Sequence, residues 1–295
     1  MPDVLQPPRP ISEPEPPQPQ PGEPSPPPAR VPNLGHALLF LALAALFLIL
    51  VQGLLFAIHP PAQRGRITLT TVDPRLLLGS QAVAYIATLL ASAALFARLW
   101  KRPFLSGVQW GGATARRQAL RLVPLGFALA IVAQGALLRF AHPKDLPIEK
   151  IFDAASSAWL ATFFGSLVAP AFEEIAFRGF LLPSLAIAYD WLSLPRDHDA
   201  HTRWRASTSL TPLALLFSAI LSSLLFVLLH GQQLVFLVPA MLVLFCVSLV
   251  LSLVRIRTQS VACSAVVHAA YNGFVFLAVL VQTGGYRHLE RLASK

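Results

Sequence analysis

Long runs of hydrophobic residues, separated by short polar segments, make up most of the chain after residue 33. The runs lie at about 34–58, 76–99, 120–140, 156–188, 211–230, 234–254 and 259–283. Most hold about 20 residues, enough for an α-helix to cross the ~30 Å hydrocarbon core of a bilayer. The pattern therefore predicts an all-α fold, a polytopic transmembrane helix bundle of about seven spans.

The segments outside the runs have a different composition. Residues 1–32 are mostly Pro, Glu, Gln and Ser with few hydrophobic side chains, which predicts a disordered tail with polyproline II character. Segments 103–118 and 189–210 read as polar connections, and a short interfacial helix is expected in the first of them.

The distribution of charge predicts the orientation of the protein in the membrane and argues against nucleic acid as a partner. Charged residues make up 13% of the chain, about half the share of a soluble domain, and the net charge is +9. The Arg and Lys residues lie mostly between the apolar runs, as the positive-inside rule describes, so we expect a bilayer and no nucleic acid as partner. The connection between the second and third runs is the most basic, which predicts a cytoplasmic N-terminus, and the composition favours a bacterial plasma membrane.

The fourth run contains three charged residues in an otherwise apolar helix. A charge near the bilayer centre costs several kcal/mol. Glu174 and Arg178 are four residues apart and are predicted to form an ion pair within the helix. Glu173 points about 100° away and has no partner in its own helix. A structural salt bridge explains the pair but leaves Glu173 unexplained, so we expect a functional role for Glu173.

Two other runs place polar side chains one turn apart. Phe226 and His230 share a face at the end of the fifth run, and His268 and Asn272 share a face inside the seventh. Each pair alone is explained by an interfacial position or by hydrogen bonding between helices. With seven spans, His230 is expected near the non-cytoplasmic end of its helix, whereas Glu173 and His268 are expected closer to the middle of the membrane.

If these faces converge, two kinds of chemistry are open. A carboxylate could activate water while imidazole and amide groups stabilise an oxyanion. Alternatively Glu173, His230 and His268 could ligate a divalent metal, zinc foremost, because His2Glu is a known catalytic ligand set.

The motifs EExxxR, FxxxH and HxxxN, in this order on successive helices, resemble those of the CPBP intramembrane proteases. This family includes the CAAX prenyl protease 2 type and the bacteriocin-processing (Abi) proteins. The resemblance covers about residues 155–280. It implies that Glu173 activates water with His230, and that His268 and Asn272 bind the developing oxyanion. It also implies that Glu174, Arg178 and Phe226 support the site.

The chain is accordingly expected to hold a tail (1–32), N-terminal transmembrane helices (33–150), a protease-like core (151–285) and a C-terminal tail (286–295). The expected activity is hydrolysis of a peptide bond in a membrane-associated protein or peptide. The alternative is a non-catalytic immunity or scaffold protein of the same fold. A transporter is disfavoured because the polar residues cluster and no internal repeat is present. The sequence makes no prediction of the oligomeric state.

Overall fold

A computed structural model describes residues 30–58, 73–140, 152 and 154–293. The predictions for residues 1–29 of the Pro-rich tail lie outside the described residues. So does the connection at 141–151.

Within the described residues the regular structure is helical and contains no strand. The elements are α1 (Leu34–Ile58), α2 (Pro74–Trp100), α3 (Phe104–Gly107), α4 (Gly112–Phe140), α5 (Ala155–Phe163), η2 (Phe164–Val168), α6 (Ala169–Glu174), η3 (Ile175–Leu181), α7 (Leu182–Leu192), α8 (His198–Ala206), α9 (Pro212–His230), α10 (Val238–Thr258), α11 (Val261–Gln282) and α12 (Glu290–Ala293). The elements η2 and η3 are π-helical.

Seven helices in the described part of the chain are long and apolar enough to cross a membrane, with α5 to α7 forming one continuous span from Ala155 to Leu192. Large apolar side chains on their outer faces are exposed, as Ile49 on α1 and Val132 on α4 illustrate. Such faces are stable against lipid and unfavourable in water. The protein is therefore an integral, multi-pass membrane protein, and the predicted helix bundle is confirmed.

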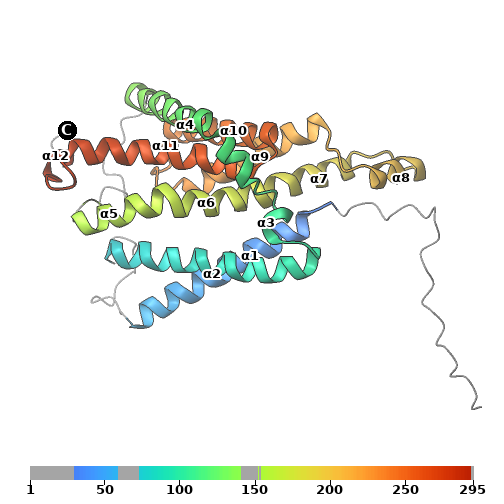
Figure 1. Cartoon of the computed structure of the whole chain (residues 1–295), viewed down its shortest axis with the longest axis horizontal. Helices are drawn as coiled ribbons and strands as arrows, with labels where there is room; N and C mark the ends of the chain where they lie inside the picture. Colours follow the sequence, from blue (N-terminus) through green and yellow to red (C-terminus); the bar gives the residue numbers. More distant parts are fainter. Residues whose placement is uncertain (1–29, 59–72, 141–151, 153, 294–295) are drawn as a thin grey trace, which may run out of the picture.

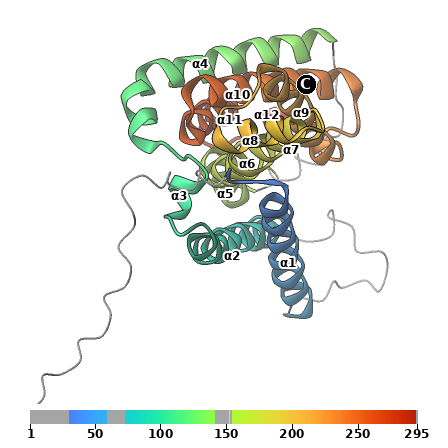
Figure 2. The same ribbon diagram turned by 90° about the vertical axis from the view of Figure 1, so that its right-hand side faces the viewer.

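The spans form layers around the continuous α5–α7 span (Figures 1 and 2). The α1–α2 hairpin lies on one side of it, α9 to α11 lie on the other, and α4 covers the outside of α10 and α11. The helices α4 and α11 approach closely at Gly126, where an added Cβ atom would lie 2.6 Å from the Cβ atom of Ala270. The central span thus contacts both flanking layers, which places its polar residues in the interior.

Two prolines explain why the central span changes its helical pitch. A proline inside a helix lacks an N–H group, and its ring clashes with the carbonyl group four residues earlier. Pro170 and Pro183 would meet the carbonyl groups of Ser166 and Gly179, and these two residues lie in η2 and η3. Widening to a π-helix relieves the clash and is frequent at functional sites.

The boundaries differ from the prediction where helices extend into polar sequence. The third span begins at Gly112, not near residue 120, because its first turns are rich in Arg, Ala and Gln, which are good helix formers. The sixth span runs from Val238 to Thr258, four residues later than predicted. The expected interfacial helix is α3, and the polar connection 189–210 holds the helix α8, which begins after the N-cap residue Asp197.

Candidate active site

The imidazole of His268 lies between the two adjacent carboxylates of the central span. Its Nδ1 atom is 3.0 Å from Oε1 of Glu174, and its Nε2 atom is 3.8 Å from Oε2 of Glu173. The first distance is a hydrogen bond and the second is longer than one. His268 on α11 is therefore hydrogen-bonded to Glu174, and its other ring nitrogen faces Glu173.

Glu174 forms the predicted ion pair with Arg178. The Nη1 atom of Arg178 donates to Oε1 of Glu174 at 2.9 Å, and both side chains are almost completely buried. The Nη2 atom of Arg178 donates to the hydroxyl and carbonyl oxygens of Ser248 on α10, at 2.7 and 2.8 Å. Because a buried charge needs such partners, this network fixes Glu174, and through Glu174 it fixes His268.

Glu173 has a different environment from its neighbour. Its side chain is 17% exposed, whereas that of Glu174 is inaccessible. It forms no hydrogen bond to any residue that the structure describes. The ring of the preceding residue, Phe172, stacks on Tyr85 of α2 at 3.8 Å between centroids. The carboxylate of Glu173 is thus held beside His268 by packing of its helix, with its oxygen atoms open to a ligand.

Phe226 connects the histidine of α9 to the rest of the cluster. Its ring stacks on His230 at 4.3 Å and meets His268 edge-on at 6.0 Å. It also meets Phe177 of the central span edge-on at 5.0 Å. Because α9 runs opposite to the central span, His230 and Glu173 each lie one turn beyond this aromatic contact in the same direction. His230 is the last residue of α9, as expected, whereas Glu173 lies near the middle of the central span.

The hydrogen bonds of His230 and Asn272 fix their orientation. Nδ1 of His230 lies 2.7 Å from the carbonyl oxygen of Phe226, which requires Nδ1–H as the donor and leaves Nε2 as the free ring nitrogen. Nδ2 of Asn272 donates to the carbonyl oxygen of Gly165 in η2 at 2.7 Å. An amide nitrogen carries two hydrogens, so Asn272 keeps a second donor for another acceptor.

A family model described as type II CAAX prenyl endopeptidase Rce1-like matches residues 155–274. This part of the chain is similar to that family. No curated protein and no solved structure matches the chain. The matched CAAX endopeptidase segment starts with α5 and contains all three motifs, so the family resemblance seen in the sequence is confirmed.

Within the matched segment, the structure brings Glu173, Glu174 and His268 into direct proximity and places Phe226 and His230 beside them. Asn272 lies one turn farther along α11, next to η2. Ser248 and Gly165 belong to the same cluster but were not predicted. Serine and glycine are common in membrane helices, so the sequence does not distinguish Ser248 and Gly165 from the other small residues of these spans.

The segment that matches the family model does not present a ready-made metal site. In the described ranges, no three or more side chains of His, Cys, Asp or Glu are grouped so that they could hold a metal ion. In particular, the ring of Phe226 lies in contact with both His230 and His268. Glu173, His230 and His268 are therefore not arranged to ligate one zinc ion together. The reaction proposed for these residues uses no metal.

Proposed function

We propose that the protein is an intramembrane endopeptidase that hydrolyses a peptide bond in a membrane-associated protein or peptide. The observation that carries the proposal is the imidazole of His268 between a buried carboxylate, which is paired with Arg178, and a partly exposed one that forms no hydrogen bond to the described residues. A purely structural network would need only the first carboxylate. The second supplies a base beside a polar hydrogen-bonding group, inside an otherwise apolar bundle.

In the proposed reaction Glu173 is the general base. It takes a proton from a water molecule as the water oxygen attacks the carbonyl carbon of the substrate. Nε2 of His230 is a free acceptor at the same level of the bundle and orients the water through its other hydrogen. When the tetrahedral intermediate collapses, the C–N bond breaks and the carboxyl group of Glu173 returns the proton to the leaving amine.

His268 and Asn272 are proposed to stabilise the oxyanion. The Nδ1–H group of His268 donates to Glu174, so the Glu174 carboxylate stabilises a positively charged imidazole whose Nε2–H group can donate to the oxyanion. Asn272 would donate its second amide hydrogen. In this scheme Glu174 and Arg178 touch no reacting atom and act as positioning residues.

The proposal is tested with purified protein and a panel of hydrophobic peptides. We expect cleavage by the wild-type protein and none by Glu173→Ala. If neither protein cleaves any peptide of the panel, or if both cleave equally, the endopeptidase proposal fails and a non-catalytic role of the same fold is favoured.

Two variants separate a metal-free reaction from a metal-dependent one. We expect His268→Ala and Asn272→Ala each to lower kcat on the order of 10²–10³-fold, with KM nearly unchanged, because each removes an oxyanion donor. Treatment with a chelator should leave the activity of the wild-type protein in place. The measurement is steady-state kinetics together with the metal content of the purified protein. Stoichiometric zinc that is lost together with activity in His268→Ala would contradict the metal-free scheme.

We further propose that the N-terminus and the connection around Arg102 face the cytoplasm of a bacterial cell. This connection carries Arg98, Lys101 and Arg102 at the end of α2, and further arginines follow in the first turns of α4. A reporter fused after Arg102 should therefore behave as cytoplasmic. Labelling of a cysteine at position 102 by an impermeant reagent in intact cells would show the opposite orientation.

A further inference from the structure

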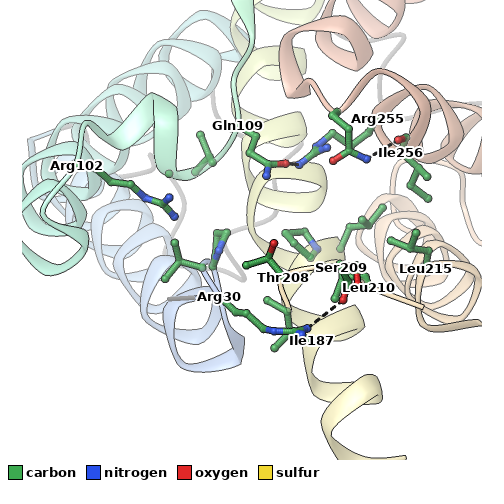
Figure 3. Close-up of a pocket in the computed structure, with 17 residues that line it drawn as sticks. Arg30, Arg102, Gln109, Ile187, Thr208, Ser209, Leu210, Leu215, Arg255 and Ile256 are labelled. Carbon is green, nitrogen blue, oxygen red and sulfur yellow. Dashed lines mark hydrogen bonds between the residues drawn. The ribbon is translucent and has the colours of Figure 1, made fainter. Parts of the chain in front are cut away.

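A cavity of about 500 Å³ lies at the basic end of the bundle, and none of the candidate active-site residues lines it. It opens between the α2–α3 connection, the start of α7, the segment before α9 and the end of α10. Its volume is in the range of small-molecule sites. Three arginines line it, and no acidic residue is among the described residues that do so. Figure 3 shows Arg30, Arg102 and Arg255 on three different sides of the cavity.

Two of the arginines are held in place by the fold. Arg255 is 4% exposed, and its Nε and Nη2 atoms donate to the carbonyl oxygen of Arg178 and to Oε1 of Gln109. The guanidinium of Arg30 lies 4.1 Å above the ring of Trp204 and donates to the carbonyl oxygens of Trp204, at the end of α8, and of Ser207 and Ser209, before α9. These bonds are all to neutral oxygens, so they position the charges without neutralising them.

Arg102 differs from the other two because nothing in the described part of the chain pairs with it. Its side chain is exposed and points from the end of α2 toward the cavity (Figure 3). Asp190 interacts electrostatically with Arg30, but it does not line the cavity, and one carboxylate cannot offset three arginines. The cavity therefore keeps an excess of positive charge.

The rest of the lining is apolar. Ile187, Leu210, Leu215 and Ile256 contribute aliphatic side chains next to the arginines. Arginine is the side chain best suited to phosphate, through its planar set of N–H donors. A cavity whose wall combines guanidinium groups with aliphatic groups matches a molecule with an anionic phosphate and an apolar portion. The spans end at this level, so lipid headgroups lie beside it.

We propose that this cavity binds a phosphate-bearing anion, and that its natural source is the headgroup of an anionic phospholipid. Arg102 and Arg255 contact the phosphate, while the aliphatic side chains contact the glycerol and the first methylene groups. The proposal is independent of the peptidase activity. Free phosphate would offer the same oxygen atoms without the apolar portion.

The test uses the purified full-length protein in a neutral detergent. Thermal unfolding is followed during titration with short-chain phosphatidylglycerol, short-chain phosphatidylcholine and inorganic phosphate. We expect phosphatidylglycerol to raise Tm in a saturable manner and phosphatidylcholine to have little effect. Arg102→Gln should weaken the apparent binding of phosphatidylglycerol about tenfold, because one charge-assisted contact is lost.

Arg98→Gln and Arg116→Gln are matched controls, since both arginines are exposed at the same end of the bundle but lie outside the cavity. Both controls should bind like the wild-type protein. Equal stabilisation by inorganic phosphate, lost in Arg102→Gln, would support the anion site and assign it to free phosphate. Equal effects of the two lipids, or unchanged binding in Arg102→Gln, would overturn the proposal. Because Arg102 is exposed, its substitution should not prevent folding.

Discussion

Replacing Glu173 by glutamine is expected to lower kcat on the order of 10²–10⁴-fold, because the amide cannot accept the proton of the attacking water. The change keeps the size of the side chain. Glu173 forms no hydrogen bond to the described residues and is partly exposed, so thermal unfolding should change little. Peptide cleavage and detergent-based thermal unfolding of the same preparation measure both effects.

Glu290→Gln serves as the control for this variant, since it removes an exposed carboxylate on α12, far along the chain from the site. It should change neither cleavage nor unfolding. Wild-type activity in Glu173→Gln would remove the proposed base and, with it, the proposed reaction.

Replacing Glu174 by glutamine is expected to have a large effect on stability as well as on activity. The substitution leaves the guanidinium of Arg178 buried without its carboxylate, and breaking one partner of a buried pair costs about 3–5 kcal/mol. It also removes the acceptor that holds Nδ1 of His268. Unfolding of the variant in detergent and its cleavage of the best peptide are the measurements.

The double variant Glu174→Gln/Arg178→Met separates the two roles of Glu174. Removing the stranded charge should recover much of the lost stability. Activity should stay low, because His268 still lacks its charged partner. Equal destabilisation by Glu173→Gln and Glu174→Gln would contradict the division between a base and a positioning residue.

The sequence predicted those features that depend on one helix at a time. Length and hydropathy identified the seven spans, because the thickness of a bilayer sets the length of a helix that crosses it. The spacing of Glu174 and Arg178 predicted their ion pair, because an α-helical turn brings residues four apart together. The order of the three motifs identified the family.

The features that depend on how helices pack against each other were not predicted. Nothing in the sequence fixes the depth at which α11 lies against the central span, so the bond from His268 to Glu174 could not be foreseen. The partners Ser248 and Gly165 were missed for the same reason. The end of α9 at His230 was expected, but where α9 lies along the central span could not be predicted, because the loops do not reveal it.

The π-helical turns of η3 give the central span room to change its length at one place. Each residue of an α-helix rotates the chain by about 100°, and each residue of the wider π-helix rotates it by less. Deleting one residue between Ile175 and Leu181 would therefore let this segment return to α-helical pitch with little change in its total rotation. The helix α7 would keep its present face toward α9, and Asp190 would stay beside Thr211. A deletion inside an ordinary α-helix such as α9 would instead turn every later residue of that helix by about 100°.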